Sequence, residues 1–263
     1  MVSLRSLLPE ACKSGLRRLR SLAYRGKGRF CPVCSKTSRR FLTVGTERRR
    51  DAQCAHCSSA ERHRFLYLFL SRKTNLFKAL PERVLHVSPT PSLEVHLQQR
   101  LGDRYLTADL YRPQAMIKMD ITDIDCPDES FDVIICSHVL EHVSDDRQAM
   151  REFCRVLKRS GWAIMMVPVT AEKTFEDPSI VTPQGRLEAF GEVDHVRRYG
   201  PDFAEILRQE GFAVKVVTVS DVATPTEIES MRLTPDSGEI YLCTKGSVSQ
   251  PQQAVGAGQY VRS

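Results

Sequence analysis

Short apolar runs alternate with helix-like segments along most of the chain. The runs, rich in branched and other apolar side chains, lie at 83–87, 105–109, 115–119, 131–136 and 162–167. Between the last two, apolar residues recur at helical spacing, and we expect Gly161 to end that helix. Strands that alternate with helices are typical of a parallel sheet covered on both faces. The pattern predicts an α/β fold with a doubly wound, mostly parallel sheet over residues 61–245.

Three further segments differ from this domain. Residues 1–29 place leucines at roughly helical spacing among arginines, which predicts a basic amphipathic arm suited to an anionic surface. Residues 30–60 hold paired cysteines, and residues 246–263 are poor in large apolar side chains, which predicts a disordered tail. No apolar run reaches the roughly 18 to 20 residues that a membrane span needs. We expect a cytoplasmic protein that touches membranes only peripherally.

The net charge of +6 is unevenly distributed. Residues 1–73 carry 18 Lys and Arg against 4 Asp and Glu, whereas the rest of the chain carries 20 against 28. A basic front on an acidic body favours an anionic partner, which could be RNA, a phosphorylated glycan or lipid, or a membrane surface. The alternative is a solvated basic face without a partner.

Four cysteines form two C-x-x-C pairs, Cys31 with Cys34 and Cys54 with Cys57. Each tight turn offers two thiolates from one side, and two such turns complete the tetrahedron that Zn²⁺ prefers. The 19 residues between the pairs are enough for the hairpin of a zinc ribbon. Because cysteine fills all four positions, the predicted zinc is structural and leaves no open position for catalysis.

The first and second strands carry candidate ligands for a nucleoside. Ser88 opens a tight loop between the strand that contains His86 and the next helix, where doubly wound folds hold nucleotide-like ligands. Asp109 ends the second strand, 21 residues after Ser88, about where such folds place a carboxylate on the two ribose hydroxyls. A helix cap or turn residue is the alternative for Asp109.

The run FDVIICSHVLEHV and the segment RVLKRSGW are the most specific part of the chain. Residues 83–243 resemble class I S-adenosylmethionine-dependent methyltransferases of the type-11 kind. The motifs CPVC, CAHC, ERHR, VLHVSP and FGEVDHVRRYG resemble a narrower, zinc-ribbon-containing subgroup. The resemblance implies a seven-stranded Rossmann-like sheet and S-adenosylmethionine as cofactor. It implies, too, that Asp109 holds the ribose, Asp120 and Ile121 flank the adenine, Ser137 and His138 border the methionine end, and His86 and Ser88 lie beside the cofactor.

The loop SPTPS departs from this family, which has glycines there. Glycine lets the backbone approach a ligand closely, so its absence weakens the expected first contact with the cofactor. The departure keeps open a methyltransferase-like binding protein that has lost catalysis.

Methyl transfer needs an aligned acceptor and, for a hydroxyl, a base. We expect His195 to be that base, because it lies in the segment that covers the substrate in this fold; a structural histidine is the alternative. The predicted function is O-methylation of a small-molecule, glycan or lipid-linked acceptor. The alternative enzyme is an RNA methyltransferase that grips phosphates with its ribbon and basic arm.

Overall fold

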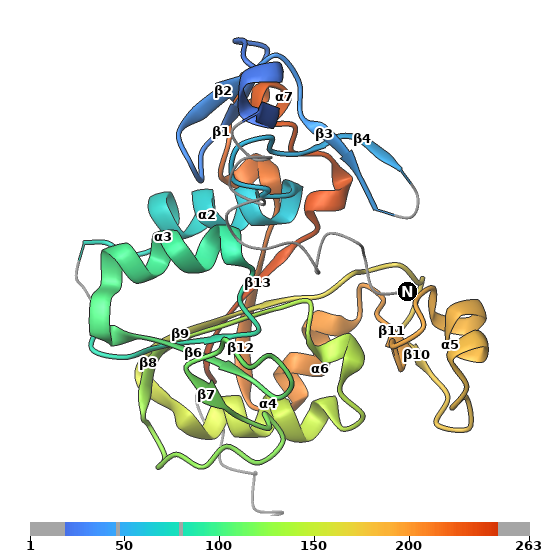
Figure 1. Cartoon of the computed structure of the whole chain (residues 1–263). Helices are drawn as coiled ribbons and strands as arrows, with labels where there is room; N and C mark the ends of the chain where they lie inside the picture. Colours follow the sequence, from blue (N-terminus) through green and yellow to red (C-terminus); the bar gives the residue numbers. More distant parts are fainter. Residues whose placement is uncertain (1–18, 46–47, 79–80, 247–263) are drawn as a thin grey trace, which may run out of the picture.

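The computed structural model describes residues 19–45, 48–78 and 81–246 (Figure 1). Its centre is a seven-stranded sheet in the order β12-β13-β9-β8-β5-β6-β7. The strands are β5 (Val84–Val87), β6 (Tyr105–Asp109), β7 (Ile117–Lys118), β8 (Phe131–Ser137), β9 (Leu157–Met166), β12 (Phe212–Val217) and β13 (Ile240–Lys245). Only β13 runs antiparallel to its neighbours. The predicted fold class is confirmed.

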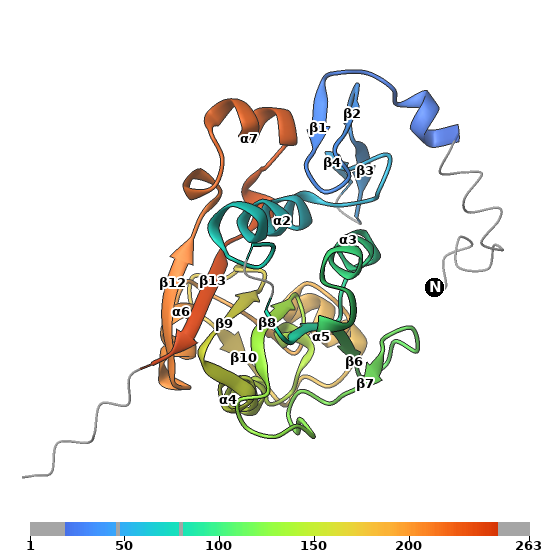
Figure 2. The ribbon, with the colours of Figure 1, turned by 90° about the vertical axis from the view of Figure 1, so that its left-hand side faces the viewer.

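Helices cover both faces of the sheet (Figures 1 and 2). Helices α2 (Glu61–Lys73) and α3 (Pro91–Leu101) lie on one face, and α4 (Asp146–Val156) and α6 (Phe203–Gln209) lie on the other. Each face has its own hydrophobic cluster, and alternate residues of β8 point to opposite ones: Ile135 to the α2 side and Ile134 to the α4 side. This double burial explains why the strands are apolar without interruption.

One boundary differs from the sequence expectation. Helix α4 starts with Asp145 as its N-cap, whose side chain accepts a hydrogen bond from the Gln148 N–H at 2.9 Å, but it already ends at Val156. Gly161 lies inside β9 and does not cap the helix. A Cβ at this position would come within 2.7 Å of the Asp132 carbonyl oxygen, so the glycine serves a close approach between β8 and β9.

The cysteine segment forms two small hairpins, β1 (Arg29–Cys31) with β2 (Lys36–Ser38) and β3 (Leu42–Val44) with β4 (Arg49–Gln53). We call residues 29–60 the ribbon. Its buried residues, among them Val33 and Phe41, belong to the same hydrophobic cluster as helix α2 and the sheet residue Val84. Helix α7 (Pro225–Met231) packs beside β1 (Figure 2). The ribbon is therefore fixed to the sheet domain by a continuous core.

Arg64 is the main polar link between these parts. Its guanidinium is fully buried and donates to the carbonyl oxygens of Ala52 and Ser59 in the ribbon and of Met231 and Arg232 after α7. It lies 4.4 Å from the centre of the Phe41 ring. A buried charge is tolerated only when it is fully hydrogen-bonded, and the four carbonyls meet that need.

The remaining elements are short and lie in the connections between those already described. They are 3-10 turns η1 (Gly102–Arg104), η2 (Leu140–His142), η3 (Val219–Asp221) and η4 (Pro235–Ser237), strands β10 (Phe175–Glu176) and β11 (Arg197–Arg198), and helix α5 (Pro183–Phe190). Most of the predicted arm and tail lies at 1–18 and 247–263, outside the described residues. Within the part that the structure describes, no helix has the length and apolar character needed to cross a bilayer.

Candidate active site

A small cavity of about 110 Å³ opens at the carboxyl end of β5 and β8. Strand β5 leads to β6 and β7 on one side, and β8 leads to β9 on the other, so the cavity lies where the strand order reverses. Doubly wound folds bind ligands at this switch point. The lining residues come from α2, the β5–α3 segment and the end of β8: Arg62, His63, Leu66, His86, Ser88, Thr90, Leu93, Ser137 and His138.

Two residues of this lining have left-handed backbones although they carry side chains. Ser88 has φ +46° and His138 has φ +57°. The Ser88 N–H donates to the Ala108 carbonyl and the His138 N–H to the Met166 carbonyl, both at 2.8 Å, and these bonds hold the two turns in place. Backbone strain of this kind concentrates at functional sites. Ser88 thus takes, at some cost, the backbone shape that glycine takes without strain.

Asp109 lies next to the cavity at the end of β6. Its Oδ2 accepts a hydrogen bond from the Ser88 hydroxyl at 2.6 Å, and its Oδ1 accepts from the N–H groups of Tyr111 and Arg112 at 2.8 Å. Partial burial raises the pKa of the Asp109 carboxyl, but these donors and the Arg112 charge together lower it, so the group is an anion at neutral pH. A carboxylate fixed in this way still has free lone pairs for a diol.

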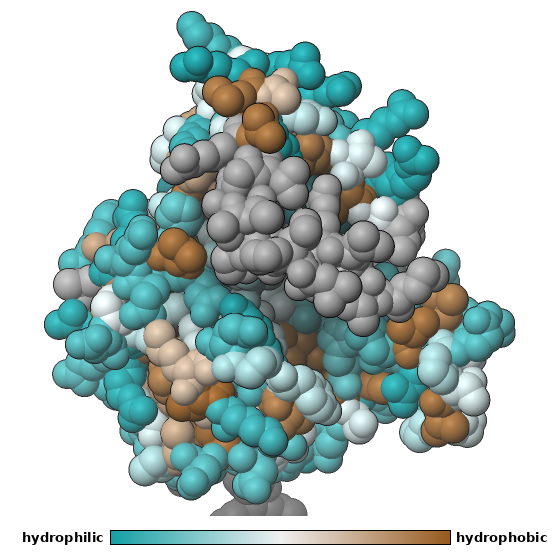
Figure 3. Space-filling view, in the orientation of Figure 1, coloured by the Kyte–Doolittle hydropathy of each residue, from teal (hydrophilic) through white to brown (hydrophobic). Residues whose placement is uncertain are grey.

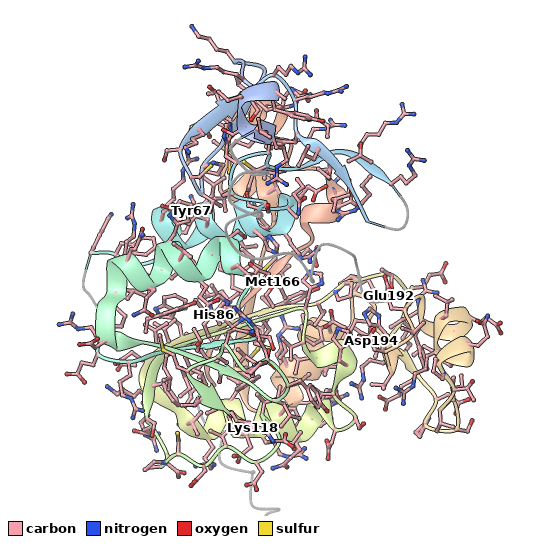
Figure 4. The ribbon with its side chains drawn as sticks, viewed as in Figure 1. Tyr67, His86, Lys118, Met166, Glu192 and Asp194 are labelled. Atoms are coloured by element: carbon pink, nitrogen blue, oxygen red, sulfur yellow. The ribbon has the colours of Figure 1, made fainter. Side chains whose placement is uncertain are left out.

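His86 forms the floor of the cavity beneath α2 (Figure 4). Its Nδ1 lies 2.7 Å from the Tyr105 hydroxyl, and only 2% of the residue is exposed. Burial, helped by the Arg112 charge, lowers the pKa of His86 to about 3. The imidazole is therefore neutral at physiological pH and can offer a hydrogen bond without adding charge.

The two residues predicted to flank adenine lie farther along the same edge and do not line the cavity. Asp120 is exposed, and its Oδ1 accepts from both the N–H and the hydroxyl of Thr122. The Ile121 side chain is packed in the core, with 6% exposed, so only its backbone could face a ligand. The Met119 N–H donates to the Asp109 carbonyl at 3.2 Å, which places this segment directly beside the end of β6.

The sequence analysis missed the contribution of α2 to the cavity, above all Arg62 and His63 in the first turn of this helix. The Arg62 guanidinium is partly buried, and within the described residues it makes no hydrogen bond or ion pair. Burial, together with the nearby Arg49 charge, lowers the pKa of Arg62. His63 accepts the Ala60 N–H through Nδ1 at 3.1 Å, and burial lowers its pKa to about 3. Among the described residues, the cavity wall therefore places the Arg62 guanidinium beside His63 and His86, both neutral at physiological pH.

His195 lies outside this lining, in a second group of polar residues. One nitrogen from His142, one from His195 and one carboxylate oxygen of Glu141 all lie within 4.8 Å of one another. The same carboxylate lies 3.3 Å from Nδ1 of His138, which does line the cavity. Burial lowers the pKa of His195, with the Glu141 charge opposing this effect. Glu141 thus connects the predicted base to the cavity.

The four predicted metal ligands converge in the ribbon. The Sγ atoms of Cys31 and Cys57 are 3.6 Å apart, and those of Cys34 and Cys54 are 3.8 Å apart. A tetrahedral Zn²⁺ with bonds of about 2.3 Å to sulfur separates its ligands by about 3.8 Å. The arrangement fits zinc, and the Arg64 guanidinium beside it would balance the negative charge of four thiolates.

The chain resembles known proteins over the same region. Residues 71–165 match the family described as "Methyltransferase domain". Within these residues the chain is similar to that family. The uncharacterized methyltransferase YcgJ of Bacillus subtilis is 37% identical over 71 residues, which are 27% of this chain and 26% of that protein. The match thus spans about a quarter of this relative's length.

The sheet domain is similar in fold to a solved structure. A chain of the complex between the Haloferax volcanii Trm112 methyltransferase activator and a methyltransferase aligns with a TM-score of 0.51. That alignment has 14% identity and covers 73% of this chain and 92% of that chain. The YcgJ structure aligns with a TM-score of 0.46 and 17% identity, over 70% of this chain and 95% of that one.

Proposed function

We propose that the chain transfers a methyl group from S-adenosylmethionine to an oxygen of a small-molecule, glycan or lipid-linked acceptor. The observation that carries this proposal is the cavity at the switch point of the methyltransferase domain, with the fixed Asp109 carboxylate beside it. A polar cavity at this edge is where the fold binds nucleoside cofactors.

In this proposal the cofactor lies along the carboxyl edge of the sheet. Asp109 accepts the ribose hydroxyls, Asp120 and the Ile121 backbone face the adenine, and the amino-acid end enters the cavity. Arg62 is the cation in the lining without a partner among the described residues, so it matches the cofactor's carboxylate. The absence of glycine from the loop after β5 then matters less for cofactor binding, because the Arg62 side chain of α2 supplies a contact that the loop backbone lacks.

The reaction asks the protein mainly to align two atoms. The acceptor oxygen attacks the methyl carbon, the carbon–sulfur bond breaks, and its electron pair stays on sulfur. A neutral hydroxyl must lose its proton in this step, and His195 remains the candidate base, set beside the buried charge of Glu141. Ser137 and His138 line the cavity, and His138 contacts Glu141.

We propose that the ribbon holds a structural zinc ion through Cys31, Cys34, Cys54 and Cys57. The ribbon then has two roles. It packs against α2 in a shared hydrophobic cluster, and it presents basic side chains to solvent. Hydrophilic surface gathers at the top of the molecule (Figure 3). The exposed cations of the ribbon and of the segment just before it are Arg25, Lys27, Lys36, Arg39, Arg40, Arg48 and Arg50. Leu19 and Leu22, about two-thirds exposed, lie beside them and favour an anionic lipid or glycan over RNA as partner.

Calorimetry with S-adenosylhomocysteine tests the cofactor proposal. We expect binding of one molecule per chain, followed by transfer of labelled methyl groups from S-adenosylmethionine into an acceptor in fractionated cell extract. Binding without transfer to any fraction would favour a protein that has lost catalysis. Absence of binding would refute the proposal.

A further inference from the structure

The second polar group contains a buried carboxyl group, Glu141, in which one of the two oxygens has no hydrogen-bond partner among the described residues. The Glu141 side chain is 2% exposed, and its Oε1 contacts His138. Its Oε2 has no hydrogen-bond partner within the described residues. Leaving a buried carboxylate oxygen unpaired costs roughly 1–3 kcal/mol or more, so such atoms call for an explanation.

Two imidazoles face the same space. The rings of His142 and His195 meet edge to face, with centres 4.7 Å apart. The structure records no hydrogen bond between either ring and the Glu141 carboxylate among the described residues, although the three donor atoms lie within 4.8 Å of one another. The three groups therefore converge to metal-binding distances without a hydrogen bond to one another.

The scaffold fixes these three groups from both sides. The Val196 N–H donates to the Glu141 carbonyl at 2.9 Å, which ties the segment of His195 to turn η2. Arg197 is buried and donates to the carbonyl oxygens of Leu140, Val143 and Ser144 at the end of the same turn. The positions of the three groups are therefore set by the fold, as a binding site requires.

We propose that Glu141, His142 and His195 bind a divalent first-row transition-metal cation beside the cofactor cavity. Two imidazoles and one carboxylate are a ligand set that binds such cations and leaves coordination positions open. The contacts of His142 with its neighbour Asp194 support a ligand role, because His142 Nδ1 lies 3.3 Å from the Asp194 carbonyl and 3.4 Å from its carboxylate. A ligating histidine commonly donates its second N–H to such oxygens. Asp194 lies between α5 and β11, beyond Met166 at the edge of the sheet (Figure 4).

Cation binding does not depend on the proposed function, but the use of the cation does. With the cation bound, the lone pair of His195 goes to the metal, and His195 is a ligand instead of the base. The acceptor hydroxyl binds an open position, where its pKa falls and its proton leaves to solvent. The oxygen then attacks the methyl carbon, and the sulfur keeps the electron pair. The matching acceptor class carries two neighbouring oxygens that can chelate the cation.

The test is a Co²⁺ titration of the full chain with its ribbon metal in place. Thiolate-bound Co²⁺ shows sulfur-to-metal absorption, whereas a nitrogen and oxygen site does not. We expect one Co²⁺ per chain without that absorption, in the wild type and in the matched control His96→Asn. His195→Asn and Glu141→Gln should weaken this binding by more than about 100-fold, and Asp194→Asn by about 10-fold to 100-fold.

Circular dichroism and S-adenosylhomocysteine calorimetry without added metal accompany each variant. Because His195 is only half-buried, His195→Asn should fold and bind S-adenosylhomocysteine normally. No Co²⁺ site in the wild type, or equal Co²⁺ affinity in His195→Asn, would overturn the inference while S-adenosylhomocysteine binding persists. Loss of S-adenosylhomocysteine binding by the wild type would instead count against the proposed function.

Discussion

Arg62 provides the sharpest test of the cofactor orientation. The side chain lines the cavity, is partly buried, and makes no ion pair within the described residues, so a bound carboxylate would be its partner. A hydrogen bond to a charged group contributes roughly 1.5–3 kcal/mol, and we take about 2 kcal/mol because the site is partly open to solvent. Arg62→Ala should therefore weaken S-adenosylhomocysteine binding by about 30-fold.

The assay is calorimetry with two ligands that differ in the amino-acid end. 5′-Methylthioadenosine keeps the adenosine and the thioether but has no carboxylate, so its affinity should change by less than about threefold in Arg62→Ala. Arg72→Ala is the control on the same helix, since Arg72 pairs with Glu227 at the far end of α2. An equal loss for both ligands would show that the substitution only disturbs the helix. Unchanged S-adenosylhomocysteine binding would refute the orientation.

Three further predictions follow from the same contacts. Asp109→Ala should weaken S-adenosylhomocysteine binding by roughly 1.5–3 kcal/mol, and normal affinity in calorimetry would exclude Asp109 from the ribose site. Arg64→Met should lower the free energy of unfolding by about 3 kcal/mol, because four buried carbonyls lose their donor; a loss below about 1 kcal/mol in urea titrations would contradict this. His86 has a pKa of about 3 when folded and an ordinary value of 6.5 when unfolded, so the unfolded chain binds the extra proton and stability falls as pH drops through this range. His86 should contribute about 1.4 kcal/mol per pH unit to this slope, and His86→Gln should reduce the slope by that amount in denaturant titrations at a series of pH values, while His63, whose pKa is also lowered to about 3, keeps its own contribution.

The sheet could be predicted where both faces of a strand are covered. Strand β6 has the predicted bounds, and β5 and β8 differ from them by one residue. At the edge of the sheet the predicted strand 115–119 was longer than the observed strand β7, in which only Ile117 and Lys118 pair with β6. It was wrong for Gly161 because Leu157 fits both a helical stripe and a strand, and only the contact with Asp132 decides between them.

The site was harder to predict because its walls come from distant parts of the chain. The carboxyl ends of two neighbouring strands bring four lining residues together by topology alone: His86, Ser88, Ser137 and His138. Arg62 has no such signal, because an arginine in the first turn of a helix is usually solvated. It is partly buried here because the first turn of α2 faces the β5–α3 segment and the end of β8 across the cavity, which is a long-range effect of packing.

Helix α2 begins only four residues after Cys57, and its first turn forms the wall of the cofactor cavity. The ribbon metal and the cofactor would therefore share one structural element. Two ligands coupled through a common element change each other's affinity by the same factor. The protein would then respond to its own metal status, because oxidation of the ribbon cysteines or loss of their metal would weaken cofactor binding. Reciprocally, a cell rich in the cofactor would slow the loss of metal from the protein.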